Sequence, residues 1–293
     1  MADIKINGAT PTGIYVGSTP ASAVYYGNVK VWEAGLPALA TRSMRFDFKY
    51  DHFNPLTDLA DKSAYGFIWT HLTGDVYDFH YDNADWGVRT IEGSTGGLFN
   101  VYMYKVSGNW YYPMANHQYD LLDMDLTGVT TASYLFASAR QVQNIYSIRN
   151  TSSVADFSFF IGSNNREFSI TSIPLFDTSS ATNMSSMFKG CTHLTSAPLF
   201  NTENVTNSYS MFYRCTSLTS VPFYDLTSVT NTSYMFYGCT AVKTGAYELY
   251  YSLSTKPIAV TTHNNTFTNC GSETAIGQIG LSQIPTDWGG TMA

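Results

Sequence analysis

Three consecutive 24-residue units decide the fold: DTSSATNMSSMFKGCTHLTSAPLF (177–200), NTENVTNSYSMFYRCTSLTSVPFY (201–224) and DLTSVTNTSYMFYGCTAVKTGAYE (225–248). They align without a gap. Several of their columns are purely apolar and repeat at a step of 24 residues, among them Phe188, Phe212 and Phe236, and Cys191, Cys215 and Cys239. A fixed period of this length predicts stacked units that share one core, because a single unit has too little apolar surface to fold alone.

Weaker copies lie on both sides of these units. DLTGVTTASYLF (125–136) matches DLTSVTNTSYMF (225–236) at most positions. HNNTFTNCG (263–271) keeps the Phe-x-x-Cys spacing after an insertion of seven residues. The repeats are therefore expected to extend over about 123–293, with a cap at the end that shields the last core residues from water.

Each unit combines two short patterns. VTNTSYMFYGC (229–239) has apolar residues at Val229, Met235, Phe236 and Cys239, which predicts a short helix of one or two turns. LTSVPFY (218–224) places Val221 and Phe223 two residues apart, which predicts a short strand with one face inward. One short helix and one short strand per 20 to 29 residues is the leucine-rich-repeat pattern, so we expect a solenoid with a parallel β-sheet and short helices.

The first part of the chain has the pattern of β-strands. GIYVGS (13–18) and AVYYGNVKVW (23–32) alternate around turn residues, and strand-like runs recur from MRFDFKY (44–50) to NVYMYKVSGNWYY (100–112). The predicted fold class is therefore α+β, with β-rich modules followed by the solenoid. The expected domains are a β-rich module at 1–35, a small β-rich domain at 41–122 that caps the solenoid, and the solenoid with its C-terminal cap at 123–293.

The composition excludes several classes of protein. Charged residues make up 13% of the chain and aromatic residues 15%, including 22 Tyr, so the surface is rich in hydroxyls, amides and phenols. The net charge of −7 without a basic cluster argues against nucleic-acid binding. No apolar run of the ~18 residues that a spanning helix needs is present, and MADIKINGATPTG does not resemble a signal peptide. We expect neither membrane insertion nor a signal peptide.

The cysteine column invites a chemical interpretation, which we weigh against packing. Stacking would place successive cysteines about 4.8 Å apart, which does not by itself forbid a disulfide. A reducing compartment and an equivalent row of thiols favour free cysteines. A straight row cannot surround a zinc ion either. We therefore predict that Cys191, Cys215 and Cys239, like Phe188, Phe212 and Phe236, form the repeat core, with no metal and no cofactor.

Catalytic patterns are sparse. The sequence has no Gly-x-Ser-x-Gly, no His-Glu-x-x-His and no phosphate-binding glycine loop. Asp-Trp-Gly occurs twice, so Asp85 and Asp287 are a candidate carboxylate pair of a glycosidase, but a turn whose Trp closes the end of a core is the simpler interpretation. DLLDMDL (120–126) lacks the glycine and the final glutamate of a calcium loop. We predict a protein that is not an enzyme.

A surface strip is the better functional candidate. The position after the repeat phenylalanine holds Lys189, Tyr213 and Tyr237, and the position two before it holds Ser186, Ser210 and Tyr234. Tyrosine offers a large, rigid contact area with a polar tip, which suits sugar or protein recognition. A solvated face without a partner is the alternative. The predicted ligand-facing residues are Tyr209, Tyr213, Tyr234, Tyr237 and Lys189.

The three units resemble BspA-like leucine-rich repeats, and the resemblance covers about 123–293. HNNTFTNCGSETAIGQIGLSQIPTDWGG (263–290) resembles the end-cap of such proteins encoded by phages and prophages of gut bacteria. VYDFHYDNADWG (76–87) resembles the region that precedes the repeats in the same proteins. IKINGATPTGIYVGSTPASAVYYGNVKVWEAG (4–35) resembles a short N-terminal module of phage virion proteins.

The resemblance implies a structural protein of the virion, assembled in the host cytoplasm and released by lysis. In this interpretation it is a head or tail fibre or decoration. The N-terminal module would contact other capsid or tail proteins, and the repeats would bind a host-surface or environmental glycan or protein. The alternative is a bacterial cell-surface or secreted adhesin. Self-association stays open, because no heptad pattern indicates a trimeric fibre.

Overall fold

The computed structural model describes the second half of the chain in most detail. It covers residues 120–133, 135–136, 142–162, 168–255 and 260–292 with their side chains, and between residues 15 and 119 it describes strands only. Three antiparallel groups lie in that first part: β1 (Tyr15–Val16) with β2 (Thr19–Pro20), β3 (Ala23–Tyr26) with β4 (Val29–Glu33), and β8 (Asp85–Glu92), β9 (Leu98–Val106) and β10 (Asn109–Tyr111) in one sheet.

A larger mixed sheet joins the first part of the chain to the repeats. Its order is β12 (Val142–Ile145), β11 (Tyr119–Asp125), β5 (Ser43–Asp47), β7 (Val76–His80) and β6 (Ile68–Thr73), and β13 (Ile148–Arg149) also pairs with β11. β11 is antiparallel to β5 and parallel to β12 and β13. The boundary expected at residue 122 therefore falls inside β11, which belongs both to the preceding sheet and to the first repeat.

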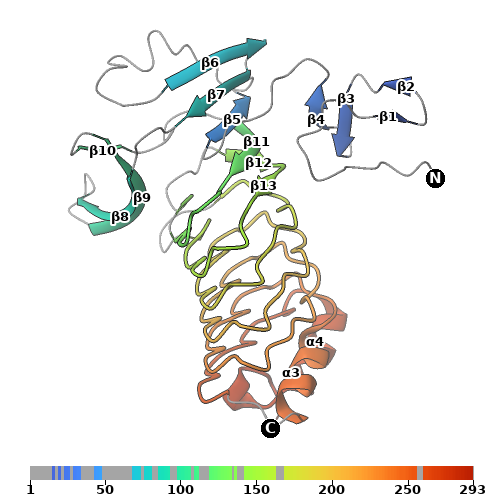
Figure 1. Cartoon of the computed structure of the whole chain (residues 1–293). Helices are drawn as coiled ribbons and strands as arrows, with labels where there is room; N and C mark the ends of the chain where they lie inside the picture. Colours follow the sequence, from blue (N-terminus) through green and yellow to red (C-terminus); the bar gives the residue numbers. More distant parts are fainter. Residues whose placement is uncertain are drawn as a thin grey trace.

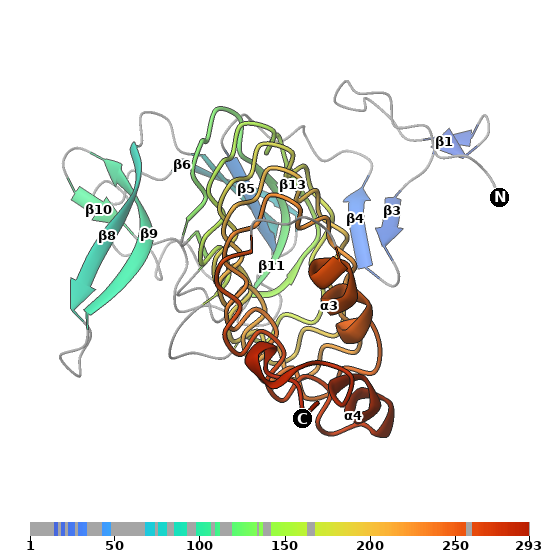
Figure 2. The ribbon, with the colours of Figure 1, turned by 90° about the horizontal axis from the view of Figure 1, so that it is seen from below.

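The repeat units lie on one another as successive coils, as Figure 1 shows in side view and Figure 2 from below. Parallel bridges link equivalent residues of neighbouring coils in one unbroken series: Thr131, Asp156, Asn183, Asn207, Asn231 and Thr262. Main-chain hydrogen bonds run the same way, for example from Phe188 N to Met211 O at 2.9 Å and from Phe212 N to Met235 O at 2.8 Å. Backbone groups that one coil cannot satisfy are thus paired by the next coil.

Side-chain amides close turns within each coil, and side-chain hydroxyls add a second set of links between coils. Asn183, Asn207 and Asn231 each accept a hydrogen bond at Oδ1 from the backbone N–H two residues on, at 3.0–3.1 Å. Thr206 Oγ1 donates to Thr182 O at 3.2 Å, and Thr230 Oγ1 donates to Thr206 O at 3.1 Å. Much of the hydroxyl content that the composition placed on a contacting surface therefore holds neighbouring coils together.

The expected short helix of each unit is replaced by hydrogen-bonded turns. The residue two before the repeat phenylalanine has positive φ in all three units: 57° at Ser186, 54° at Ser210 and 60° at Tyr234. A right-handed helix needs φ near −63°, so this residue interrupts it. The apolar positions face the core as the helical spacing predicted, but regular helices occur only later in the chain among the described residues.

The expected strand LTSVPFY is also reduced, to a single bridge from Ser220 to Thr244. Pro222 has no N–H to donate to a strand ladder. Val221 is buried as predicted, but Phe223 points outward and is 57% exposed. Its equivalents Leu175 and Leu199 are exposed as well.

The core is a column of side chains inside the coils. The rings of Phe188, Phe212, Phe236 and Phe267 stack with centroid separations of 5.3, 5.3 and 6.0 Å. The four cysteines are buried and free. The four coils with Phe188, Phe212, Phe236 and Phe267 thus each contribute one ring and one thiol to a continuous apolar interior, which a single unit could not enclose.

The last coil is closed by α3 (Ala246–Thr255), α4 (Ala275–Leu281) and the 3-10 helix η1 (Thr286–Trp288), at the C-terminal end in Figure 1. Thr274 caps α4 by accepting the Gly277 N–H at 3.0 Å. Trp288 packs against the core and stacks on His263 with a centroid separation of 4.0 Å. In the part of the chain that the structure describes, no helix is both long and apolar enough to cross a membrane.

Candidate binding surface

Four tyrosines from two neighbouring units meet on the outside of the coils. Tyr213 and Tyr237 stack with centroids 5.0 Å apart and planes within 8°. Tyr234 contacts both of them, at 6.4 and 5.8 Å, and meets the ring of Tyr209 edge to face at 5.9 Å. We call Tyr209, Tyr213, Tyr234 and Tyr237 the tyrosine cluster.

Two cationic side chains complete this surface. Lys189 Nζ lies 4.8 Å from the centroid of the Tyr213 ring, and Arg214 Cζ lies 5.4 Å from the same centroid. Both distances are within the range of a cation–π interaction. Burial lowers the pKa of Lys189, and the charge of Arg214 lowers it further. The chain as a whole is acidic, whereas these two side chains place positive charge beside the tyrosine cluster.

The backbone at Arg214 is unusual for its residue type. Arg214 has a φ of 59°, and the equivalent residues of the neighbouring units are glycines, Gly190 and Gly238, with φ of 79° and 72°. The left-handed region costs a residue with a side chain about 1–2 kcal/mol. An arginine that replaces a repeat glycine there points to a role for the side chain.

The hydroxyls of the tyrosine cluster differ from that of a structural tyrosine. Tyr224 is buried, and its hydroxyl donates to Pro198 O at 3.0 Å. None of the four cluster hydroxyls forms a hydrogen bond to another described residue. Tyr209 is 39% exposed, and the other three rings are half-buried. Four phenol groups are thus available to a ligand on a surface whose rings already hold one another in place.

The structure places the five predicted ligand-facing residues together: Lys189, Tyr209, Tyr213, Tyr234 and Tyr237 all belong to this surface. Ser186 and Ser210 were expected on the same strip, but both are buried. Ser186, Ser210 and Tyr234 all have positive φ, at 57°, 54° and 60°, so the backbone is alike and the larger Tyr234 side chain reaches out of the column where serine does not. Sequence reasoning missed Arg214, although its place in the Gly190 and Gly238 column was a visible signal.

The predicted core residues lie away from this surface. Phe188, Phe212, Phe236, Cys191, Cys215 and Cys239 are fully buried. Burial raises the pKa of the Cys215 thiol, and the neighbouring cysteines raise it further. A nucleophilic or metal-binding cysteine needs the opposite shift.

The acidic residues considered as candidate sites do not form a site among the described residues. Asp120 accepts a hydrogen bond from Asn144 at 2.7 Å, and Asp123 pairs with Arg149 at 2.9 Å. Asp287 is exposed in η1, and the side chain of Asp85 lies outside the described residues. In the described ranges no group of three His, Cys, Asp or Glu side chains could hold a metal ion.

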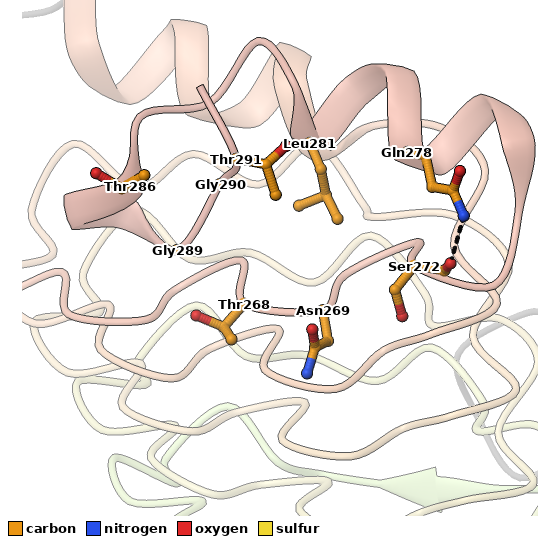
Figure 3. A pocket seen from close by; sticks show the side chains of 9 residues that line it. All are labelled: Thr268, Asn269, Ser272, Gln278, Leu281, Thr286, Gly289, Gly290 and Thr291. Atoms are coloured by element: carbon orange, nitrogen blue, oxygen red, sulfur yellow. Dashed lines mark hydrogen bonds between the residues drawn. The ribbon is translucent and has the colours of Figure 1, made fainter. Parts of the chain in front are cut away.

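A second feature is a hollow in the C-terminal cap, which we call the cap pocket (Figure 3). It has a volume of about 370 Å³ and opens to solvent between the last coil, α4 and η1. Its lining is uncharged: Thr268, Asn269, Ser272, Gln278, Leu281, Thr286, Gly289, Gly290 and Thr291. Figure 3 shows Leu281 pointing into its centre from α4.

Comparison with known proteins assigns a family to the coils. The family described as "Mycoplasma protein of unknown function, DUF285" matches the chain three times, at residues 107–218, 130–249 and 159–272. The matches overlap and together span more than half of the chain. The chain belongs to DUF285. No curated protein and no solved structure matches it.

The DUF285 matches cover the whole tyrosine cluster but only part of the cap pocket. The region from residue 107 to residue 272 contains Lys189, Arg214 and the whole tyrosine cluster. It includes one wall of the cap pocket, at residues 268–272, and ends before α4 and η1. The tyrosine cluster is thus built by the DUF285 repeats themselves, and the cap pocket forms where those repeats meet the C-terminal cap.

Proposed function

We propose that this chain is a non-enzymatic binding protein whose repeats hold a glycan at the tyrosine cluster. The observation that carries the proposal is the meeting of six side chains from three consecutive units on one surface: Lys189, Tyr209, Tyr213, Arg214, Tyr234 and Tyr237. No single unit could present this combination.

The geometry favours a hydrogen-bonding ligand. One face of the Tyr213 ring is covered by Tyr237 and the ring also carries Lys189 and Arg214, so a ligand meets ring edges and hydroxyls more than open ring faces. A sugar presents many hydroxyls together with apolar C–H edges, and both fit such a surface. Lys189 and Arg214 can also donate hydrogen bonds to a sugar oxygen or to a carboxylate on a sugar.

The setting we propose is a phage particle, in which the chain is a head or tail fibre or decoration. Support comes from the resemblance of 4–35, 76–87 and 263–290 to segments of phage-encoded proteins. The N-terminal module at 1–35 would attach to capsid or tail proteins, and the coils would project to the host surface. Mass spectrometry of purified particles is expected to detect this chain, and particles without it would refute the setting.

A printed glycan array tests the ligand class directly. The full chain should bind at least one glycan, and Tyr213→Ala should weaken that binding at least tenfold because it removes the ring that contacts Tyr237 and both cations. Tyr251→Ala is the matched control, since Tyr251 is an exposed tyrosine on α3 outside the cluster. An array without any bound glycan, or equal losses in the two variants, would overturn the proposal.

A bacterial adhesin is the second candidate, because the matching family is described as a Mycoplasma protein. The same tyrosine cluster would then bind its ligand from a cell surface. Detection of the chain by antibody on intact, unlysed bacterial cells would favour this setting over the particle.

A further inference from the structure

The cap pocket lies in line with one column of the repeats, which we call the tyrosine column. Lys189, Tyr213 and Tyr237 occupy equivalent positions in three units, and Thr268 occupies that position in the last coil. Gly238 N donates to Thr268 O at 2.8 Å, which fixes this register. Thr268 and Asn269 also line the pocket, so the pocket begins one coil, about 4.8 Å, beyond the end of the Tyr213–Tyr237 stack.

The lining of the pocket has the chemistry of a neutral, hydroxyl-rich ligand. It combines four hydroxyl residues and two amide residues with the apolar side chain of Leu281 and carries no charge. The side chains of Asn269, Ser272, Thr286 and Thr291 form no hydrogen bond to any other described residue. Ligand pockets typically pair apolar walls with a few polar groups in a volume of roughly 300–1,000 Å³, and 370 Å³ lies in this range.

Two glycines keep the pocket in shape. A Cβ atom at Gly290 would collide with Ile284 O, and one at Gly289, where φ is 89°, would collide with Thr268 Oγ1. The segment after η1 therefore packs tightly against the last coil on one side. Gln278 Nε2 donates to Ser272 O at 2.7 Å on the other side, as Figure 3 shows. The pocket is thus braced from two directions rather than left between independent loops.

We infer that the cap pocket is a second subsite, which binds an uncharged sugar unit at the end of a glycan chain that lies along the tyrosine column. The ligand class rests on the proposed function, whereas the pocket and its register with Tyr237 rest on the structure alone. An apolar floor under a ring of hydroxyls and amides suits one face and the edge of a pyranose.

Saturation-transfer NMR on the full chain tests the subsite with single sugars. The probes are glucose, galactose, mannose and N-acetylglucosamine, with glucuronic acid as the charged comparison. At least one neutral sugar should receive saturation, and Thr291→Trp, which fills the pocket, should reduce its signal at least fivefold. Thr291→Val keeps the shape and should reduce it less. Thr286→Trp fills the pocket from η1 and replaces Thr291→Trp should that variant lose its thermal transition.

The outcomes separate the subsite from the cluster. A neutral-sugar signal that Thr291→Trp removes and Tyr213→Ala leaves unchanged supports the subsite, even where the array experiment fails. Absence of signal from all four neutral sugars, or a signal that survives both filled variants, overturns the subsite and leaves the cluster proposal intact.

Discussion

At the scale of single residues, the repeat cysteines act as packing groups with one specific bond. Cys215 Sγ donates to Phe188 O at 3.2 Å, and Cys239 Sγ donates to Phe212 O at 3.1 Å, each across one coil. The 24-residue step predicted their burial, because equivalent positions of stacked units share an environment. The bonds themselves could not be predicted, since they depend on how one coil is offset against the next.

The buried thiols make stability depend on pH above about 9. Burial raises the pKa of Cys239 from an ordinary 9.0 to about 12, so the folded state keeps a proton that the unfolded state releases. The contribution is complete below pH 9 and is lost between 9 and 12, at about 1.4 kcal/mol per pH unit for this thiol. Urea unfolding at pH 8, 9 and 10 should show a shallower decline for Cys239→Ala than for the parent. An equal decline of stability with pH in the variant and the parent would contradict the role assigned to the Cys239 thiol.

Ser186 should be more favourable as glycine. Its φ of 57° disfavours a side chain, and its buried Oγ has no hydrogen-bond partner among the described residues. We expect Ser186→Gly to raise the free energy of unfolding by about 1 kcal/mol, because both costs disappear. Ser208→Gly is the control: Ser208 Oγ donates to Asn231 O at 3.2 Å, so this change should destabilise. Urea titration measures both, and a loss of stability in Ser186→Gly would contradict the assignment.

At the scale of elements, the sequence predicted which side chains face inward better than it predicted regular structure. The apolar positions of 229–239 follow a helical spacing, yet positive φ at Tyr234 breaks the helix into turns. This conformation is hard to foresee because tyrosine seldom adopts it. Pro222 was a visible warning against a strand, and Phe223 turns outward beside it.

Two phenylalanines of the same unit test this account of the coils. Phe212 lies in the middle of the stacked ring column, so Phe212→Ala should cost about 3–5 kcal/mol of unfolding free energy. Phe223 is 57% exposed, so Phe223→Ala should change stability by less than about 0.5 kcal/mol. Denaturant melts of both variants measure the difference. Similar losses would show that the LTSVPFY segment has an inward face at Phe223 after all.

At the scale of the whole molecule, the surface exists only because units stack. The 24-residue step of the repeats predicted that Lys189, Tyr213 and Tyr237 align. The contact of Tyr209 with Tyr234 joins different columns of two units, and the cap pocket joins the last coil to α4 and η1. Such neighbours depend on the pitch of the coils and the path of the cap, neither of which has a local sequence signal.

Arg214 links the binding proposal to the architecture. Arg214→Gly removes about 1–2 kcal/mol of left-handed backbone cost but also loses a cation–π contact of about 0.5–1 kcal/mol and adds the chain entropy of glycine, about 0.5–1 kcal/mol. We therefore expect an unfolding free energy within about 1 kcal/mol of the parent. A purely structural arginine would instead show a clear loss of stability on this change.

The most direct test of the central claim is calorimetric titration of the best array glycan into the parent, Tyr213→Ala and Arg214→Gly. A Kd at least tenfold weaker for both variants, with Arg214→Gly as stable as the parent, is the result that the tyrosine cluster predicts. An unchanged Kd in both variants would contradict it and place the glycan elsewhere on the molecule.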